Sequence, residues 1–89
     1  MIYSQQFLKF AIVEIKSKIG NRIKELRDVK KMSQKDLAYV SDLDRSYIAS
    51  VEKGQRNISI VNIEKIAVAL EVALKEFFNT IDFENITTN

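Results

Sequence analysis

Two short amphipathic segments lie almost back to back within residues 32–57, and only the four residues SDLD separate them. Ser33, with Asp36 three positions later, resembles a capping box in which aspartate replaces the usual Glu or Gln, and it predicts the start of the second helix of the chain. Asp44 is a candidate N-cap for a third helix over residues 45–53, and a glycine follows at the left-handed position. Two short helices joined by so short a turn form a helix-turn-helix.

The residues around this motif also favour helices. The 89-residue chain has no proline and only two glycines, Gly20 and Gly54, so few residues interrupt a helix. In the first thirty residues apolar side chains recur at steps of three and four, as on one helix face, at Leu8, Ile12, Ile15, Ile19, Ile23 and Leu26. The stripe is either one long helix or two helices that meet near Gly20-Asn21, and it predicts core or dimer surface.

Two further helices are expected in the C-terminal part. Ser59 can cap a fourth helix that ends near Leu70, and a fifth should span about residues 74–79. The side chains expected to face the core from the second and fourth helices are Leu37, Val40, Ile60, Ile63, Ile66, Ala67 and Leu70. The sequence thus predicts an all-α fold with five helices, divided into an N-terminal helical extension (1–18), a helix-turn-helix domain (19–80) and a polar C-terminal tail (81–89).

Missing residue types exclude several classes of protein. Without histidine or cysteine the chain has no disulfide framework, no cysteine nucleophile and no ligands for most zinc, haem or iron–sulfur sites. A serine–lysine or carboxylate enzyme remains formally open, but no spacing supports one, so we expect no enzymatic activity and no cofactor. No apolar run approaches the roughly 18 residues of a membrane span, and the first ten residues do not resemble a secretory signal. A cytoplasmic location without membrane association is therefore expected.

The charges are unevenly placed along the chain. Residues 1–57 hold twelve basic and seven acidic residues, whereas residues 58–89 hold two basic and five acidic ones. A basic front and an acidic back suggest that the front meets an anion such as nucleic acid, although a run of charge is usually a solvated face.

With these residues in view, the chain resembles a known family. The stretch IGNRIKELRDVKKMSQKDLAYVSDLDRSYIASVEKGQRNISIVNIEKIAVAL looks like the phage repressor/Cro type of helix-turn-helix, a five-helix DNA-binding domain, and the match covers about Ile19 to Phe78. The segments RIKELR, SQKDLA, SYIASVEKG and IEKIAVAL carry it. Within that type, LDRSYIASVEKGQRN is similar to the small controller proteins of restriction–modification systems. The resemblance implies a transcriptional regulator that binds double-stranded DNA.

The resemblance also implies roles for single residues. Those expected to read base edges are Arg45, Ser46 and Ser50, with Tyr47 at a thymine methyl or the backbone. Those expected to contact phosphates are Gln34, at the start of the second helix, and Gln55, Arg56 and Asn57 after the recognition helix. Purely structural roles stay open for these residues: the polar side chains are solvated on an exposed helix, and the tyrosine packs on the turn.

Three further features follow from the family pattern. Arg27 and Glu52 match a pair that forms a buried salt bridge between the first and third helices. Lys31 and Asp42 stand where the family often has glycine. Aspartate tolerates the left-handed conformation better than most residues, so we expect the turn at Asp42 to survive, whereas the first helix is expected to end differently at Lys31.

A homodimer is expected because one recognition helix reads only a few base pairs, and two-fold dimers are the usual route to specificity on an approximately palindromic operator. Phe77 and Phe78 point about 100° apart on one helix, so both cannot face the same core. One is expected inside, and the other should meet the partner subunit together with Val61 or Leu74. The N-terminal stripe is the competing interface.

Alternatives remain at the level of function. The rivals are an antitoxin-like or phage-type repressor, and a helical protein-interaction module that no longer binds DNA. Asp36, Asp42 and Asp44 cluster near the second helix, either as an activating patch for RNA polymerase or in capping and turn roles. The operator, the sign of regulation, the regulated genes, any effector and the role of residues 1–18 do not follow from the sequence.

Overall fold

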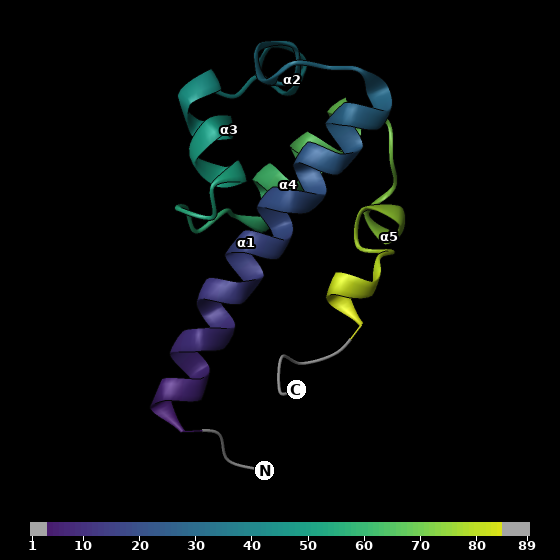
Figure 1. Cartoon of the computed structure of the whole chain (residues 1–89). Helices are drawn as coiled ribbons and strands as arrows, with labels where there is room; N and C mark the ends of the chain where they lie inside the picture. Colours follow the sequence, from purple (N-terminus) through teal and green to yellow (C-terminus); the bar gives the residue numbers. More distant parts are fainter. Residues whose placement is uncertain (1–3, 85–89) are drawn as a thin grey trace.

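The computed structural model describes residues 4–84, and this part of the chain is helical throughout, with no strand (Figure 1). This confirms the predicted all-α fold. The elements are α1 (Gln5–Lys30), α2 (Gln34–Ser41), α3 (Arg45–Glu52), α4 (Ile60–Ala69), α5 (Leu74–Phe77) and a 3₁₀ helix, η1 (Ile81–Phe83). No helix within residues 4–84 is both long and apolar enough to span a bilayer.

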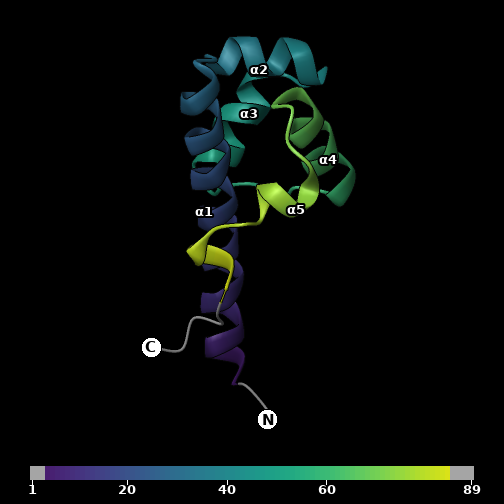
Figure 2. The same cartoon turned by 90° about the vertical axis from the view of Figure 1, so that its right-hand side faces the viewer.

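The N-terminal stripe belongs to one uninterrupted helix, α1, of 26 residues. Gly20 does not break it. A Cβ at Gly20 would lie 2.6 Å from the backbone carbonyl oxygens of Val51 and Glu52, so the glycine lets α3 cross α1 closely. The half of α1 before this crossing projects beyond the other helices, in a molecule that measures 42 × 24 × 20 Å (Figure 2). Residues 5–18 of the expected extension are thus continuous with the first domain helix, and residues 1–3 lie outside the described residues.

The core lies between the C-terminal half of α1 and the four shorter helices. Its buried apolar side chains are Ile19, Ile23, Leu26, Leu37, Ala38, Ile48, Val51, Ile63, Ile66, Ala67, Ala69, Leu70 and Phe77. Two of the predicted core residues, Val40 and Ile60, are exposed instead. The inner face of α2 runs through Leu37, Ala38 and Ser41, which leaves Val40 outside it. Ile60 lies in the first turn of α4, about 90° around the helix from the centre of its buried face.

The helix ends follow the sequence signals closely. Ser33 and Asp36 form the predicted capping box, and Ser59 caps α4 by accepting a hydrogen bond from a backbone N–H. Gly54 has a φ of 72°, in the left-handed region. Asp42 adopts the left-handed conformation, as expected, but so does Lys31, with a φ of 56°. The prediction that the first helix ends differently at lysine was wrong: Lys31 adopts the left-handed conformation despite its unfavourable backbone energy for a residue with a Cβ.

The C-terminal segment is more structured than a polar tail. α5 is shorter than expected, because Phe78 forms its C-cap. Ile81–Phe83 form η1, and the ring of Phe83 packs edge-on against Phe78 at 5.1 Å while its side chain lies against the core. Residues 85–89, the remainder of the expected tail, lie outside the described residues.

Candidate nucleic-acid interface

The exposed face of α3 is the first part of the candidate interface. Ile48 and Val51 are buried and fix α3 to the core, so the opposite face of the helix points to solvent. Arg45 and Ser46, at its N-terminal end, are exposed, and within residues 4–84 neither side chain takes part in a hydrogen bond or ion pair. Asp44 takes the N-cap conformation, but its carboxylate makes no capping hydrogen bond. The start of the expected recognition helix is therefore open to a ligand.

Tyr47 and Ser50 are half-buried and hold the segment that follows α3. The Tyr47 hydroxyl accepts a hydrogen bond of 3.0 Å from the Asn62 side chain on α4. The guanidinium of Arg56 lies 5.4 Å from the centre of the Tyr47 ring, and its Nε donates to Ser50 Oγ at 3.0 Å. Ser50 Oγ in turn donates to the Tyr47 backbone carbonyl. These two expected base readers thus have structural partners, and they hold Arg56 beside α3.

The expected phosphate contacts divide into two groups. Gln55, Arg56 and Asn57 are exposed together directly after α3. Gln34 lies at the first position of α2, but it is half-buried and its Nε2 donates to the Glu52 carboxylate at 3.0 Å. Its side-chain nitrogen therefore has one of its two N–H groups left for another acceptor.

Arg27 and Glu52 form a bidentate pair between α1 and α3. Arg27 Nε and Nη2 lie 2.7 and 2.8 Å from the two carboxylate oxygens of Glu52, and Arg27 Nη1 donates to the backbone carbonyl of Met32. The Glu52 side chain is only 2% exposed. The hydrogen bonds to Glu52 raise the pKa of Arg27 above its ordinary value, so the guanidinium stays charged. Because Gln34 joins the same carboxylate, one buried group ties α1, α2 and α3 together.

The residues expected at a dimer surface are not equally available. Val61 is 62% exposed on α4, Phe78 is 37% exposed after α5, and Leu74 is half-buried. Phe77, by contrast, has no exposed surface, because its ring fills the core of the monomer. Phe77 therefore has to be removed from the expected interface, and Phe78 is the phenylalanine that faces outward.

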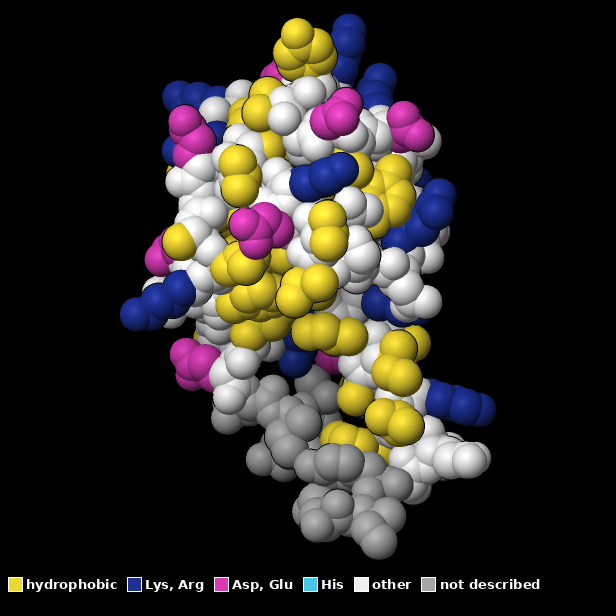
Figure 3. Space-filling model, turned by 180° about the vertical axis from the view of Figure 1, so that it is seen from behind, with side chains coloured by type: hydrophobic (Ala, Val, Ile, Leu, Met, Phe, Trp, Pro, Cys, Tyr) yellow, Lys and Arg dark blue, Asp and Glu magenta, His cyan; other side chains and the backbone are white. Residues whose placement is uncertain are grey.

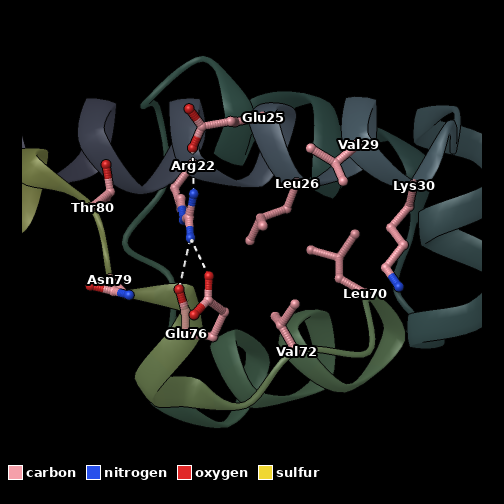
Figure 4. A pocket seen from close by; sticks show the side chains of 10 residues that line it. All are labelled: Arg22, Glu25, Leu26, Val29, Lys30, Leu70, Val72, Glu76, Asn79 and Thr80. Carbon is pink, nitrogen blue, oxygen red and sulfur yellow. Dashed lines mark hydrogen bonds and ion pairs between the residues drawn. The ribbon is translucent and has the colours of Figure 1, made fainter.

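Arg22 carries a structural role that the sequence analysis missed. Its Nε and Nη2 donate to the backbone carbonyls of Phe77 and Glu76 at 2.7 Å each, and it forms ion pairs with Glu25 and Glu76 (Figure 4). Although charged, Arg22 is buried at one end of a groove of about 450 Å³ between α1 and α5. An arginine beside Ile23 in the apolar stripe was the available signal, but its backbone partners lie more than fifty residues away. This arginine fixes α5 on α1.

Comparisons with known proteins agree with this geometry. A family model described as "Helix-turn-helix" matches residues 23–77. The control protein C.MunI of a Mycoplasma species is 46% identical over 72 residues, which cover 80% of this chain and 97% of that protein. The crystal structure of the restriction–modification controller protein C.AhdI from Aeromonas hydrophila superimposes with a TM-score of 0.68 at 52% identity, covering 71% of this chain and 96% of that one.

A further solved structure contains DNA. It is the tetramer of the restriction–modification controller protein C.Esp1396I in complex with its natural 35 base-pair operator, with a TM-score of 0.68, 46% identity, and coverage of 71% of this chain and 83% of that one. These similarities extend over nearly the whole length of C.MunI and C.AhdI. This chain therefore belongs to the helix-turn-helix family and, within it, to the controller proteins of restriction–modification systems.

Proposed function

We propose that this protein binds an approximately palindromic DNA operator as a homodimer and regulates transcription of a restriction–modification operon. The observation that carries the proposal is an open recognition helix, α3, in a domain that matches controller proteins along almost their entire length. One of those proteins, C.Esp1396I, has been seen on its operator. A regulator of this kind acts in the cytoplasm, and nothing in the candidate interface calls for enzymatic chemistry.

Base recognition falls mainly to the start of α3. The major groove is wide enough to admit an α-helix, and an arginine at the N-terminal end of that helix can pair bidentately with guanine O6 and N7. Arg45 suits this role because its side chain is exposed and forms no hydrogen bond or ion pair within residues 4–84. Ser46 lies beside it. Tyr47 and Ser50 contribute at the edge of the contact, since their polar groups already have partners.

Phosphate contacts position α3 in the groove. Gln55, Arg56 and Asn57 follow α3 as an exposed group, and Arg56 is held against Tyr47, so its guanidinium is already ordered before DNA arrives. Gln34 can donate its second N–H to a phosphate at the start of α2 while it remains bonded to Glu52. Such contacts supply affinity without sequence information.

The homodimer brings two α3 helices onto one face of the duplex. Val61 on α4 and Phe78 at the end of α5 are exposed apolar side chains, and Leu74 of α5 is half-buried. A two-fold contact through this surface repeats the same residues on both subunits. On an operator, the two recognition helices should then lie about 34 Å apart, one turn of the duplex.

RNA polymerase is a further proposed partner at activated promoters. Asp36 and Asp42 have structural roles in the capping box and the left-handed turn. Asp44 is exposed and makes no capping bond, so its carboxylate is the one available for an activating contact. In transcription assays with purified polymerase, Asp44→Asn should lower activation without weakening operator binding. Equal activation by both proteins would remove polymerase from the proposal.

The decisive experiment begins with selection of bound sites from a random duplex library, followed by binding titrations on the selected and random duplexes. Arg45→Ala should cost about 1–3 kcal/mol on the selected site and relax preference at one position in each half-site. Arg56→Ala is the matched control, because loss of a phosphate contact weakens both duplexes about equally and reduces the salt dependence.

Two outcomes would contradict the proposal. If Arg45→Ala weakens both duplexes equally, Arg45 contacts only the backbone. If the wild-type protein shows no salt-dependent binding to any duplex, the protein is a helical interaction module that does not bind DNA. Antitoxin-like or phage-type repressors remain the alternative within DNA binding, and the genes beside this one would separate them from a controller.

A further inference from the structure

The N-terminal half of α1 exposes apolar side chains beyond its crossing with α3. Residues 5–18 extend the helix by about 21 Å at 1.5 Å per residue, and Figure 2 shows this end projecting past the other helices. Its large exposed apolar side chains are Leu8, Phe10, Ile12, Val13 and Ile15. The family model begins only at residue 23, so this arm lies outside the shared domain. We call residues 5–18 the arm.

The arm presents its stripe on the same side of α1 as the core. At about 100° per residue, Leu8, Ile12 and Ile15 continue the line of the buried residues Ile19 and Ile23. Higher in the molecule that side of α1 packs mainly on α3, and below the crossing Ile12 and Ile15 line a groove of about 250 Å³ with Ile58, just before α4. Seen from behind, hydrophobic side chains gather over α4 and appear again along the N-terminal end of α1 (Figure 3). The arm therefore continues the face that carries the proposed dimer surface.

The charges of the arm and of the C-terminal segment are opposite. Residues 5–18 contain three lysines and one glutamate, whereas residues 71–84 contain four acidic residues and one lysine. At 100° per residue, Lys16 projects about 40° and Lys9 about 60° around the helix from Ile12, on the same side of the stripe. Within residues 4–84, neither lysine forms an ion pair, and neither do Asp82 and Glu84 beside η1.

Few of the side chains expected at the dimer surface of the domain are exposed. A standard interface buries about 800 Å² on each partner. α5 has only four residues, and of the expected contacts only Val61 and Phe78 are exposed. The arm of one subunit and the exposed Ile81 of η1 on the other would add apolar surface to both partners of a dimer.

We propose that in the homodimer the arm of each subunit lies along the α5–η1 segment of its partner. The stripe formed by Leu8, Ile12 and Ile15 covers Phe78 and Ile81 of the other copy, and the lysines of the arm face Asp82 and Glu84. The two-fold axis makes this contact twice, so each subunit gives an arm and receives one. This inference rests on the proposed homodimer and adds the arm to its interface.

Cross-linking tests the contact directly, because the wild-type chain contains no cysteine. Leu8→Cys and Ile81→Cys proteins, distinguished by tags of different length, are mixed, allowed to exchange subunits and treated with a short bismaleimide. We expect a cross-link that joins one Leu8→Cys chain to one Ile81→Cys chain. A cross-link only between two Leu8→Cys chains would overturn the proposal, since the arms would then pack on each other.

Sedimentation provides an independent measurement. Ile12→Glu should raise the dimer dissociation constant at least about tenfold, as expected for a side chain central to an interface. Gln6→Glu is the matched control, because it adds the same charge to an exposed position on another side of the arm, and it should leave the constant unchanged. Circular dichroism verifies that both variants keep the wild-type helix content.

The outcomes separate the arm from the homodimer itself. A wild-type protein that stays monomeric at all concentrations overturns both. A wild-type dimer that shows no mixed cross-link, and that Ile12→Glu does not weaken, overturns the arm contact alone. In that case loss of the dimer in Val61→Glu would place the interface on α4, without any contribution from the arm.

Discussion

Removing the charge of Glu52 should destabilise the fold severely. Glu52→Gln keeps the size and shape of the side chain but replaces one carboxylate oxygen with an amide nitrogen. In the wild type the carboxylate accepts three hydrogen bonds, two from Arg27 at 2.7 and 2.8 Å and one from Gln34 at 3.0 Å. In the variant the new NH₂ group faces a donor, and the Arg27 guanidinium loses its only ion-pair partner within residues 4–84.

The burial of the pair sets the magnitude. The side chains of Arg27 and Glu52 are 13% and 2% exposed, so water cannot replace the lost partner. Breaking a buried pair by removing one charge costs about 3–5 kcal/mol, a large share of the roughly 5–15 kcal/mol that stabilises a typical domain. For a chain of this size such a loss lowers Tm by at least about 10 °C.

Thermal and urea unfolding, followed by circular dichroism, measure this loss. Glu64→Gln is the matched control, since it makes the same change at an exposed position of α4 and should alter the free energy of unfolding by less than about 0.5 kcal/mol. If Glu52→Gln also costs less than about 1 kcal/mol, the pair behaves like a surface salt bridge, and the reasoning from burial is wrong.

Three further predictions concern the backbone and the cap. Lys31→Gly should raise the free energy of unfolding by up to about 1 kcal/mol because glycine adopts the left-handed φ of 56° without strain, whereas Lys31→Ala should give no gain; denaturant titration compares them. Gly20→Ala should cost about 1–3 kcal/mol in the same assay despite the better helix propensity of alanine, since its Cβ meets backbone oxygens of α3. Hydrogen bonds from Ser33, the one from its backbone above all, lower the pKa of Asp36 below its ordinary value of 3.8. The ionised Asp36 therefore stabilises the folded state above pH 3.8, and this stabilisation is lost as the pH falls through the lowered pKa. Acid titration of stability should therefore show wild type and Asp36→Asn converging only below about pH 3.8.

Local signals in the sequence were sufficient where the structure is determined locally. The capping box of Ser33 and Asp36 needs only residues three apart, and the left-handed Gly54 needs only the end of one helix. The pairing of Arg27 with Glu52 was of another kind. It came from the family resemblance, because spacing within one helix says nothing about a partner 25 residues away.

The features that sequence reasoning missed depend on contacts between distant helices. Gly20 looked like a possible break, but it is the point where α3 approaches α1, which only the packing reveals. Lys31 takes a conformation that its own propensity disfavours, because the chain must turn there into α2. Arg22 stood in an apolar stripe, and its carbonyl partners at the end of α5 could not be inferred from periodicity.

Two arginines of α1, Arg22 and Arg27, fix the positions of two other helices. Arg27 holds the recognition helix through Glu52, and Arg22 holds α5, next to the proposed dimer surface, through the carbonyls of Glu76 and Phe77. They are five residues apart on one continuous helix, so they project about 140° apart around a rigid rod. In a two-fold dimer the separation of the recognition helices is set by the contacts between α3 and the proposed dimer surface, which include both arginines and the direct hydrogen bond between Tyr47 of α3 and Asn62 of α4. A protein that must match half-sites about one helical turn apart needs these contacts to be stiff. The multiple hydrogen bonds of these two arginines contribute to that stiffness, because they fix direction as well as distance.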